Sequence, residues 1–308
     1  MISAGRLLWL LKRDLGRGWS ASYHHYRTLP LIEQWYWPHW HKKLSTVPVH
    51  LLTGKNDWQL AAWMLASLFQ FTEMVWPVVI HDDGTLPEDG RAVLQSLFRN
   101  CRFVKRDEAD AAMEKALRPY PMCLQYRSAN PLGLKIFDMA HFAESERFIV
   151  LDSDVLFFRP PREIMQWSRG PEPRECWFNE DVQEASLISA SDAMDELGVN
   201  LWSRVNSGIC LIHRPAIDFD FCDQTLAVTS ILRGKLWRVE QTLFALCASR
   251  HGRGGLLPRT YEVSLKRNAS RDVVARHYVG AVRQRFFGEG LRRLAPVLLA
   301  DEKAPPAK

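Results

Sequence analysis

From Val47 onward, the chain of 308 residues alternates short apolar runs with longer amphipathic stretches, and this alternation leaves few possible folds. The apolar runs have the length of β-strands, and the stretches between them carry apolar residues at helical spacing. The sequence predicts strands at Val47–Leu52, Trp76–Ile80 and Cys101–Val104, with helices at Asp57–Phe71 and Pro87–Arg99. Strands that alternate with helices indicate an α/β fold, with a Rossmann-like, mixed but mainly parallel central sheet and helices on both faces.

Polar residues follow the first two predicted strands. Thr53-Gly54 comes after the first strand, and Asp82-Asp83-Gly84, a turn sequence, comes after the second. In open α/β sheets, ligands bind at the carboxyl ends of the strands. We therefore expect Thr53 and Asp83 to contribute to a ligand-binding edge.

The segment Arg147–Pro160 is an apolar run that is interrupted by two carboxylates, Asp152 and Asp154. A continuous strand would direct both carboxylates to one face, where burial without partners is prohibitive. A strand that ends at a ligand edge avoids this problem if a divalent cation lies between the carboxylates, because Mg²⁺ and Mn²⁺ prefer oxygen ligands. The alternative is a turn between two strands with both aspartates in solvent. The hydrophobic surroundings and the three preceding β/α units favour the metal site.

Further strands and helices are predicted around this segment, although the stretch up to about Asn130 shows no regular pattern. The predicted elements are helices at Leu132–Phe142, near Asp223–Leu232 and at Leu243–Ser249, and strands at Cys176–Phe178 and Ile209–Ile212. Polar groups border them: Asn179-Glu180-Asp181, Asn206-Ser207-Gly208 and Val239-Glu240-Gln241-Thr242. These groups could line a site, but Asn-Ser-Gly is also a common turn, and Gln241 at a helix start also fits a capping residue.

With these motifs in this order, the chain resembles glycosyltransferases of the GT-A fold, and the motif order is most similar to glycosyltransferase family 8. The resemblance covers about residues 47–290. Its most specific parts are Asp152-Ser153-Asp154 on a strand and the late segment His277–Arg283. That segment keeps the family's His-x-x-Gly-x-x-Lys spacing, with Arg283 in place of Lys and Gln284-Arg285 in place of the following Pro-Trp. The resemblance implies that Asp152, Asp154 and His277 hold Mn²⁺ or Mg²⁺ against the diphosphate of a nucleotide sugar.

The same resemblance implies roles for other residues. Lys135, about 17 positions before Asp152, would belong to the donor site together with Gly280 and Arg283. Asn206-Ser207-Gly208 is similar to the family's acceptor-side Asn-Ala-Gly motif. Glu240-Gln241-Thr242 is similar to its Asp-Gln-Asp motif, whose Gln lies beside the reacting carbon. Gln241, Asn206 and Asp181 are therefore the expected catalytic or acceptor-binding residues, with Glu180 as an alternative to Asp181.

The activity that the resemblance implies is metal-dependent glycosyl transfer. A nucleoside-diphosphate sugar, with a UDP-sugar as the expected donor, would give its sugar to a glycan, lipid-linked or other hydroxyl acceptor, with retention of anomeric configuration. This chemistry requires a metal ion and fixed cations, because negative charge grows on the leaving diphosphate. Two alternatives remain open at this point. One is a haloacid-dehalogenase-like phosphatase, which carries DxD on its first strand, and the other is a non-catalytic nucleotide-sugar-binding protein.

Charge is unevenly distributed along the chain, which carries +5 overall. Residues 1–45 hold seven basic and two acidic residues, residues 250–300 hold eleven and three, and the region between them is acidic. Basic blocks suggest anion binding. Nucleic acid is not the expected anion, because no helix-turn-helix, zinc-finger or RNA-recognition signature accompanies the charge. A phosphorylated small molecule or an anionic membrane surface fits better.

Composition divides the chain into an aromatic, basic arm at residues 1–45, a GT-A domain at 46–295 and a disordered tail at 296–308. The arm contains five tryptophans, Trp9, Trp19, Trp35, Trp37 and Trp40. It either lies at a membrane interface or packs on the domain, and we favour packing.

The sequence also predicts the compartment. No run approaches the roughly 18 apolar residues of a membrane span, and Leu7–Leu11 is too short for a signal-peptide core. The six cysteines show no CxxC pair and no zinc-like spacing, which is typical of buried thiols in a reducing compartment. We therefore expect a cytoplasmic protein, with peripheral association at the inner membrane face as an option.

Overall fold

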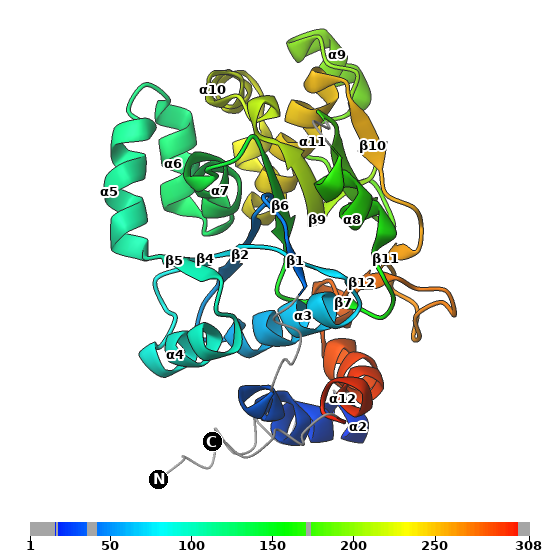
Figure 1. Ribbon diagram of the computed structural model, residues 1–308. Helices are drawn as coiled ribbons and strands as arrows, with labels where there is room; N and C mark the ends of the chain where they lie inside the picture. Colours follow the sequence, from blue (N-terminus) through cyan, green and yellow to red (C-terminus); the bar gives the residue numbers. More distant parts are fainter. Residues whose placement is uncertain (1–15, 17, 36–41, 171–173, 301–308) are drawn as a thin grey trace.

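A computed structural model describes residues 16, 18–35, 42–170 and 174–300, and its centre is a seven-stranded sheet with the strand order β10-β8-β9-β6-β2-β4-β5 (Figure 1). The strands are β2 (Val49–Thr53), β4 (Val78–Asp82), β5 (Cys101–Val104), β6 (Arg147–Leu151), β8 (Cys176–Glu180), β9 (Val205–His213) and β10 (Gly254–Leu256). Strands β6, β2, β4 and β5 are parallel, as are β10 and β8, whereas β9 lies antiparallel between β6 and β8. The mixed, mainly parallel sheet confirms the predicted fold class.

Alternate residues of the strands face two separate hydrophobic cores. In β6, Ile149 and Leu151 belong to one core, and Phe148 and Val150 belong to the other. Figure 1 shows helices on both sides of the sheet. The first core includes residues of three helices, α3 (Trp58–Gln70), α4 (Glu88–Leu97) and α8 (Arg162–Arg169). The second core includes residues of the helices on the other face, which are α5 (Arg106–Ala116), α6 (Pro121–Ala129), η3 (Leu134–Asp138), α7 (Met139–Phe142), α9 (Ala190–Leu197), α10 (Phe219–Val228) and α11 (Val239–His251). Because helices cover both faces, the strands need continuous apolar runs, which the sequence displays.

Two of these helices, α5 and α6, occupy the stretch before Asn130 where the sequence shows no regular pattern. The sequence predicts no element for that stretch, and the structure adds these two helices. Only Ala109 and Met113 of α5 are buried, and most of its other residues are charged. So narrow an apolar stripe gives a weak periodic signal. The helix expected near Asp223 begins earlier, at Phe219, because the Asp218 carboxylate accepts backbone N–H groups of its first turn.

The apolar run that contains the two aspartates is divided between two sheets. Strand β6 stays in the large sheet, whereas β7 (Val155–Phe157) joins β12 (Ala275–His277) and β11 (Tyr261–Val263) in a three-stranded sheet with the order β11-β12-β7. Strand β12 is antiparallel to β7, with His277 opposite Val155. This pairing brings a residue from near the C-terminus beside the turn between β6 and β7.

Residues 18–35 of the arm pack on the domain. They form α2 (Trp19–Tyr23), η1 (His24–Thr28) and η2 (Leu29–Gln34), which lie beside η8 (Phe286–Leu291) and α12 (Arg292–Leu298) in Figure 1. Ala21, Leu29, Ile32 and Trp35 are buried in the same core as α3, and the indole N–H of Trp63 donates to the Leu29 carbonyl (2.9 Å). For these residues the favoured packed arrangement is what the structure shows. Leu7–Leu11, Trp9, Trp37, Trp40 and residues 301–308 lie outside the described residues.

Two further observations concern the cysteines and the character of the helices. All six cysteines are free thiols. In the described part of the chain, no helix combines the length and the apolar character needed to cross a bilayer.

The remaining small elements are the short parallel pair β1 (Lys43–Leu44) and β3 (Met74–Val75) and the single turns η4 (Arg214–Ala216), η5 (Ile231–Arg233), η6 (Leu236–Arg238) and η7 (Gly280–Val282).

Candidate metal and diphosphate site

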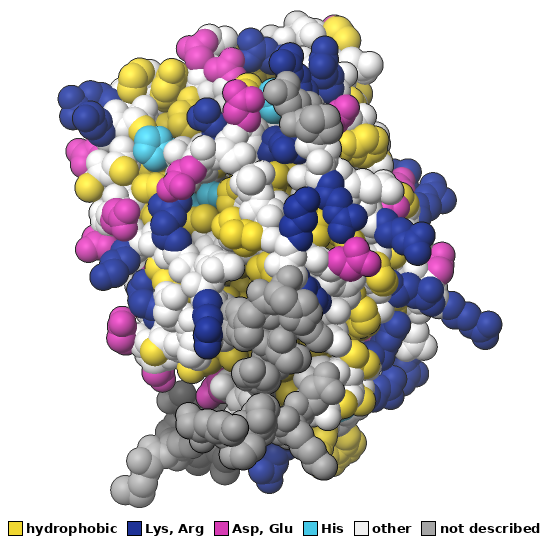
Figure 2. Space-filling model, viewed as in Figure 1, with side chains coloured by type: hydrophobic (Ala, Val, Ile, Leu, Met, Phe, Trp, Pro, Cys, Tyr) yellow, Lys and Arg dark blue, Asp and Glu magenta, His cyan; other side chains and the backbone are white. Residues whose placement is uncertain are grey.

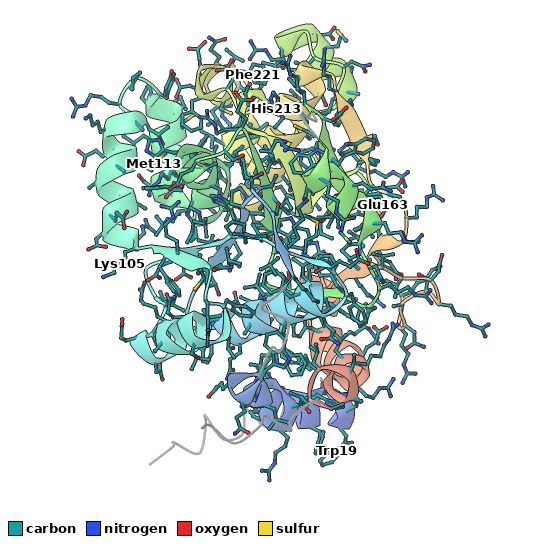
Figure 3. All side chains as sticks on the ribbon, viewed as in Figure 1. Trp19, Lys105, Met113, Glu163, His213 and Phe221 are labelled. Carbon is teal, nitrogen blue, oxygen red and sulfur yellow. The ribbon has the colours of Figure 1, made fainter. Side chains whose placement is uncertain are left out.

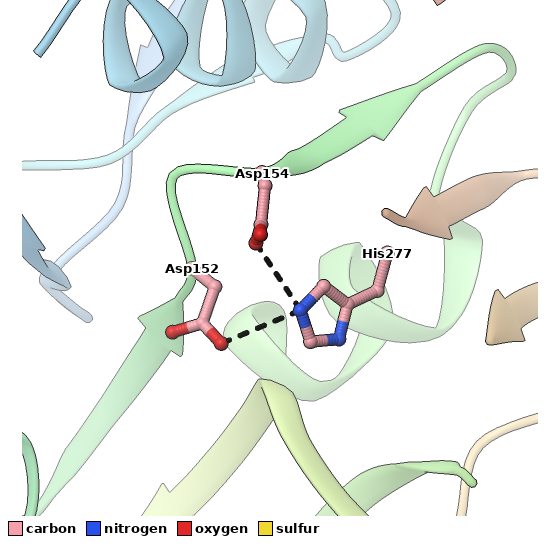
Figure 4. A group of neighbouring side chains, drawn as sticks. All are labelled: Asp152, Asp154 and His277. Atoms are coloured by element: carbon pink, nitrogen blue, oxygen red, sulfur yellow. Dashed lines mark ion pairs between the residues drawn. The ribbon is translucent and has the colours of Figure 1, made fainter. Parts of the chain in front are cut away.

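The turn between β6 and β7 places Asp152 and Asp154 beside His277 of β12 (Figure 4). The His277 Nε2 atom is 3.1 Å from Asp154 Oδ1 and 3.6 Å from Asp152 Oδ2. One donor atom from each residue lies within 4.8 Å of the others. The sequence predicted this trio as metal ligands, and the fold brings the three side chains together at the carboxyl end of β6.

A hydrogen bond on the ring nitrogen that faces away from the aspartates fixes the orientation of His277. Its Nδ1 lies 2.8 Å from Asn206 Oδ1, an oxygen that also accepts the Gly208 backbone N–H (3.0 Å). Since that amide oxygen can only accept, Nδ1 carries the proton, and in the neutral ring Nε2 keeps a free electron pair toward the aspartates. A hydrogen bond of this kind on the far nitrogen is the usual support of a metal-binding histidine. A Cβ atom at Gly208 would lie 2.1 Å from His277 Nδ1, so only glycine leaves room for the ring.

The electrostatics couple the trio. Burial opposes ionisation of Asp154, but His277, Arg283 and Lys135 outweigh it and hold the pKa of Asp154 below its ordinary value. Burial also disfavours the charged form of His277, yet the charges of Asp154 and Asp152 raise the pKa of His277 overall. Two carboxylates and one imidazole form a donor set that suits a divalent ion such as Mn²⁺ or Mg²⁺. The residues present therefore fit a divalent metal.

Lys135 lies beneath the trio in a buried network. Its ammonium is 2.8 Å from Asp152 Oδ1 and 3.0 Å from Glu240 Oε1, and it donates to the Ser207 carbonyl (2.8 Å). Burial opposes the charge on Lys135, but Asp152 and Glu240 raise its pKa. These contacts use the donors of the ammonium, so in this structure Lys135 orients Asp152 and neutralises the buried Glu240. The sequence identified Glu240 only as part of a motif, because nothing local indicates its partner.

Arg283 reaches the trio from the other side. Its Nη2 donates to Asp57 Oδ1 (2.7 Å), and its Nε is 3.6 Å from Asp154 Oδ2. Burial raises the pKa of Asp57. The charges of Asp154 and Asp83 add to this effect, whereas Arg283 opposes it. A cavity of about 500 Å³ opens beside Asp57, Gly280 and Arg283. Asp57 is not among the residues predicted from the sequence, although its position after the Thr53-Gly54 edge, at the start of α3, was a usable signal.

Thr53 and Asp83 lie at the same edge, at the ends of β2 and β4. The Asp83 backbone N–H donates to the Thr53 carbonyl (3.0 Å). The Asp83 carboxylate accepts from the backbone N–H and hydroxyl of Thr85 (2.8 and 2.6 Å), and it lies so close over Gly54 that a Cβ there would meet it at 2.2 Å. Thr53 is buried, and its hydroxyl has no hydrogen-bond partner among the described residues.

The expected acceptor-side residues adjoin the metal trio through Asn206. The Asn206 amide donates to Asp181 Oδ2 (2.8 Å) and, more weakly, to Gln241 Oε1 (3.4 Å). The Gln241 oxygen also accepts the Ser207 backbone N–H (3.3 Å). Glu180 points elsewhere, to the guanidinium groups of two arginines. Asp181, Asn206 and Gln241 thus form one polar chain that ends at His277, and Glu180 stands outside it.

The fold is shared with solved glycosyltransferases. Mouse xyloside xylosyltransferase 1 is similar with a TM-score of 0.54 and 14% sequence identity, over 77% of this chain and 98% of that one. The galactosyltransferase LgtC, solved with donor and acceptor sugar analogues, is similar with a TM-score of 0.52 and 16% identity, over 84% and 98%. The bifunctional glycosyltransferase WbbM gives a TM-score of 0.50 and 12% identity, over 77% and 46%. No family model matches the chain, and no curated protein matches it in sequence. At these identities the likeness shows the fold, which is the GT-A fold of glycosyltransferases.

Proposed function

We propose that the protein is a metal-dependent glycosyltransferase that moves a sugar from a nucleoside-diphosphate sugar to a hydroxyl acceptor. The observation that carries this proposal is the convergence of Asp152, Asp154 and His277 at the ligand edge of a GT-A fold. The expected donor is a UDP-sugar, and the expected acceptor is a glycan or lipid-linked hydroxyl. The transferred sugar is expected to retain its anomeric configuration. We further propose that the protein acts in the cytoplasm and attaches peripherally to a membrane through the arm at residues 1–45. The described part of the arm packs on the domain with its inner side, so its solvent-facing side would make that attachment.

The chemistry of the proposal follows from the charge that the leaving group acquires. Asp152, Asp154 and His277 would hold Mn²⁺ or Mg²⁺, which supplies electrostatic stabilisation of the diphosphate as the sugar departs. Arg283, which is 39% exposed and beside Asp154, is the side chain best placed to donate to phosphate oxygens. Lys135 would not contact the diphosphate itself. Its role is to hold the side chain of Asp152 in place.

The acceptor side of the proposal rests on the polar chain around Asn206. Gln241 presents an amide next to the backbone of Ser207, where it can contact the donor sugar near its reacting carbon. Asp181 offers a carboxylate to an acceptor hydroxyl while it holds the Asn206 amide. Asn206 connects both residues to the imidazole of the metal site.

The phosphatase alternative requires its aspartates on the first strand of the sheet. Here β2, β4 and β5 all precede β6 in the chain, which argues against that class. A non-catalytic nucleotide-sugar-binding protein would have the same donor site. Only a measurement of turnover distinguishes it from an enzyme.

The test is Mn²⁺-dependent release of nucleoside diphosphate by the full-length protein from a panel of nucleotide sugars. Asp154→Asn and His277→Ala should each lower the rate by about a thousandfold. Asp195→Asn, which alters an exposed aspartate on α9, should leave it unchanged. Thermal stabilisation by a nucleotide sugar without turnover would identify a binding protein, and phosphate release from simple phosphomonoesters would identify a phosphatase. Unchanged turnover by Asp154→Asn would contradict the metal role.

A further inference from the structure

The N-terminal helices α2, η1 and η2 present a stripe of large side chains to solvent. Trp19 is 87% exposed, Tyr23 62%, Tyr26 48% and Leu31 37%. These positions recur at helical intervals on the outer side, whereas Ala21 on the inner side is buried. Of the eleven large hydrophobic side chains that are exposed among the described residues, four lie in this short segment. Figure 3 places Trp19 at the outer end of the molecule, beside α12.

A cleft of about 530 Å³ opens at the Trp19 end of this stripe, between the arm and the C-terminal segment. Three guanidinium groups line it, from Arg267, Arg285 and Arg292. Arg267 and Arg292 form no ion pair with a described residue, and the Arg285 Nε atom is buried without a hydrogen-bond partner. The acidic residue of the lining, Glu289, is buried and already paired with a neighbouring arginine (2.9 Å). No described acidic residue is therefore left to neutralise the positive charge of the cleft.

The positive charge continues beyond the cleft. Figure 2 shows Lys and Arg side chains along the right-hand side of the molecule, over β10, β11 and toward α12. The basic block at residues 250–300 contributes exposed side chains beside these elements, among them Arg259 and Lys266. Within residues 18–35, by contrast, Arg27 is the one Lys or Arg residue, so the stripe itself is aromatic with a basic border.

We propose that the stripe Trp19–Leu31 and the adjoining arginine cleft form a docking surface for an anionic phospholipid membrane, with a lipid phosphate in the cleft. Tyr and Trp side chains favour the membrane interface, where the ring meets acyl chains and the polar atom meets water. Guanidinium groups donate well to phosphate oxygens, and a basic border is attracted to anionic lipids. A site for free phosphate gives no reason for an exposed aromatic stripe, and a nucleic-acid track would need cations along the stripe.

The surface lies next to the proposed donor site. The His25 ring of the arm contacts the Phe287 ring (centroids 4.6 Å apart), and His25 lines the same cavity as Arg283. A membrane-bound molecule would therefore hold its donor site near lipid-linked acceptors. The assignment rests on the membrane attachment in the proposed function and not on the transfer chemistry, so a vesicle assay without donor tests it separately.

The experiment is sedimentation of the full-length protein with phosphatidylcholine vesicles, with and without phosphatidylglycerol, at low and high salt. Binding should require phosphatidylglycerol and weaken with salt. Trp19→Ala/Tyr23→Ala and Arg267→Gln/Arg292→Gln should each weaken binding by about tenfold or more. The matched control Arg233→Gln/Trp237→Ala removes one exposed cation and one exposed indole elsewhere and should bind like the unaltered protein. All these side chains are exposed, so the melting temperature should not change.

Several results would overturn the proposal. Equal binding to neutral and anionic vesicles would exclude an electrostatic surface, and full binding by both stripe and cleft variants would place the contact elsewhere. If inorganic phosphate binds in an Arg267- and Arg292-dependent way while vesicles do not bind, the cleft is a site for a free anion. If duplex DNA binds as strongly as the vesicles and loses affinity in the cleft variant, the partner is nucleic acid.

Discussion

Replacement of Lys135 by methionine keeps the length of the side chain but removes the cation that neutralises Glu240. Glu240 is 2% exposed, and after the substitution its remaining side-chain contact is the Ser207 hydroxyl (3.1 Å). Breaking a buried ion pair in this way typically destabilises a protein by about 3–5 kcal/mol. The folded variant can instead protonate Glu240. With an ordinary Glu pKa of about 4.3, that protonation at pH 7 lowers the free energy of unfolding by about 3.7 kcal/mol.

The protonation route gives the variant a characteristic pH dependence. In the folded variant Glu240 holds a proton that the unfolded chain releases above about pH 4.3, so its stability relative to the parent protein falls as the pH rises. The loss should be about 3–4 kcal/mol at pH 7 and under about 2 kcal/mol at pH 5.5. A second substitution, Lys135→Met/Glu240→Gln, removes the uncompensated charge. It should recover most of the stability and abolish this pH dependence.

The assay is urea unfolding followed by circular dichroism at pH 7 and 5.5, with the parent protein and both variants measured side by side. If Lys135 served only to contact donor phosphate, Lys135→Met would unfold like the parent protein and show only a raised donor KM. Unaltered stability at pH 7, or an equal loss at both pH values, would refute the buried-network argument.

Three other changes test separate parts of the structure. Burial lowers the pKa values of His50 and His81, that of His81 to about 3, so the unfolded chain binds more protons below pH 6.5. Acidification from pH 6.5 to 5.5 should then reduce the free energy of unfolding by about 1 kcal/mol for each imidazole, and His50→Leu/His81→Leu should lose this sensitivity in urea titrations. Arg283→Ala should raise the donor KM about tenfold or more with little change in melting temperature, because its half-exposed ion pair contributes under about 1 kcal/mol, whereas Arg283→Lys should retain much of the activity. Gly208→Ala should displace the metal-site imidazole and weaken Mn²⁺ binding about tenfold or more in calorimetry; unchanged affinity would show that the ring can move.

The sequence alone determined the elements whose burial is complete. The residues Val78–Ile80 of β4 and Phe148–Leu151 of β6 are covered on both faces, and such burial demands a continuous apolar run that is visible without any partner. It also predicted a metal site at Asp152 and Asp154, since two carboxylates in an apolar run need a charge partner wherever the chain goes, and the resemblance to glycosyltransferase family 8 added His277 to that prediction. It did not reveal α5, because a helix with two buried residues has almost no periodic signal.

Only the tertiary structure decided how these pieces meet. The antiparallel pairing of β12 with β7 places His277 beside Asp154, and no local pattern encodes a pairing between strands so distant in sequence. The same holds for the contacts of Lys135 with Asp152 and Glu240, which make Lys135 a buried support of both carboxylates. Burial and ion pairing depend on which side chains the whole fold brings together, so a sequence can show that a charge needs a partner without showing which partner it will have.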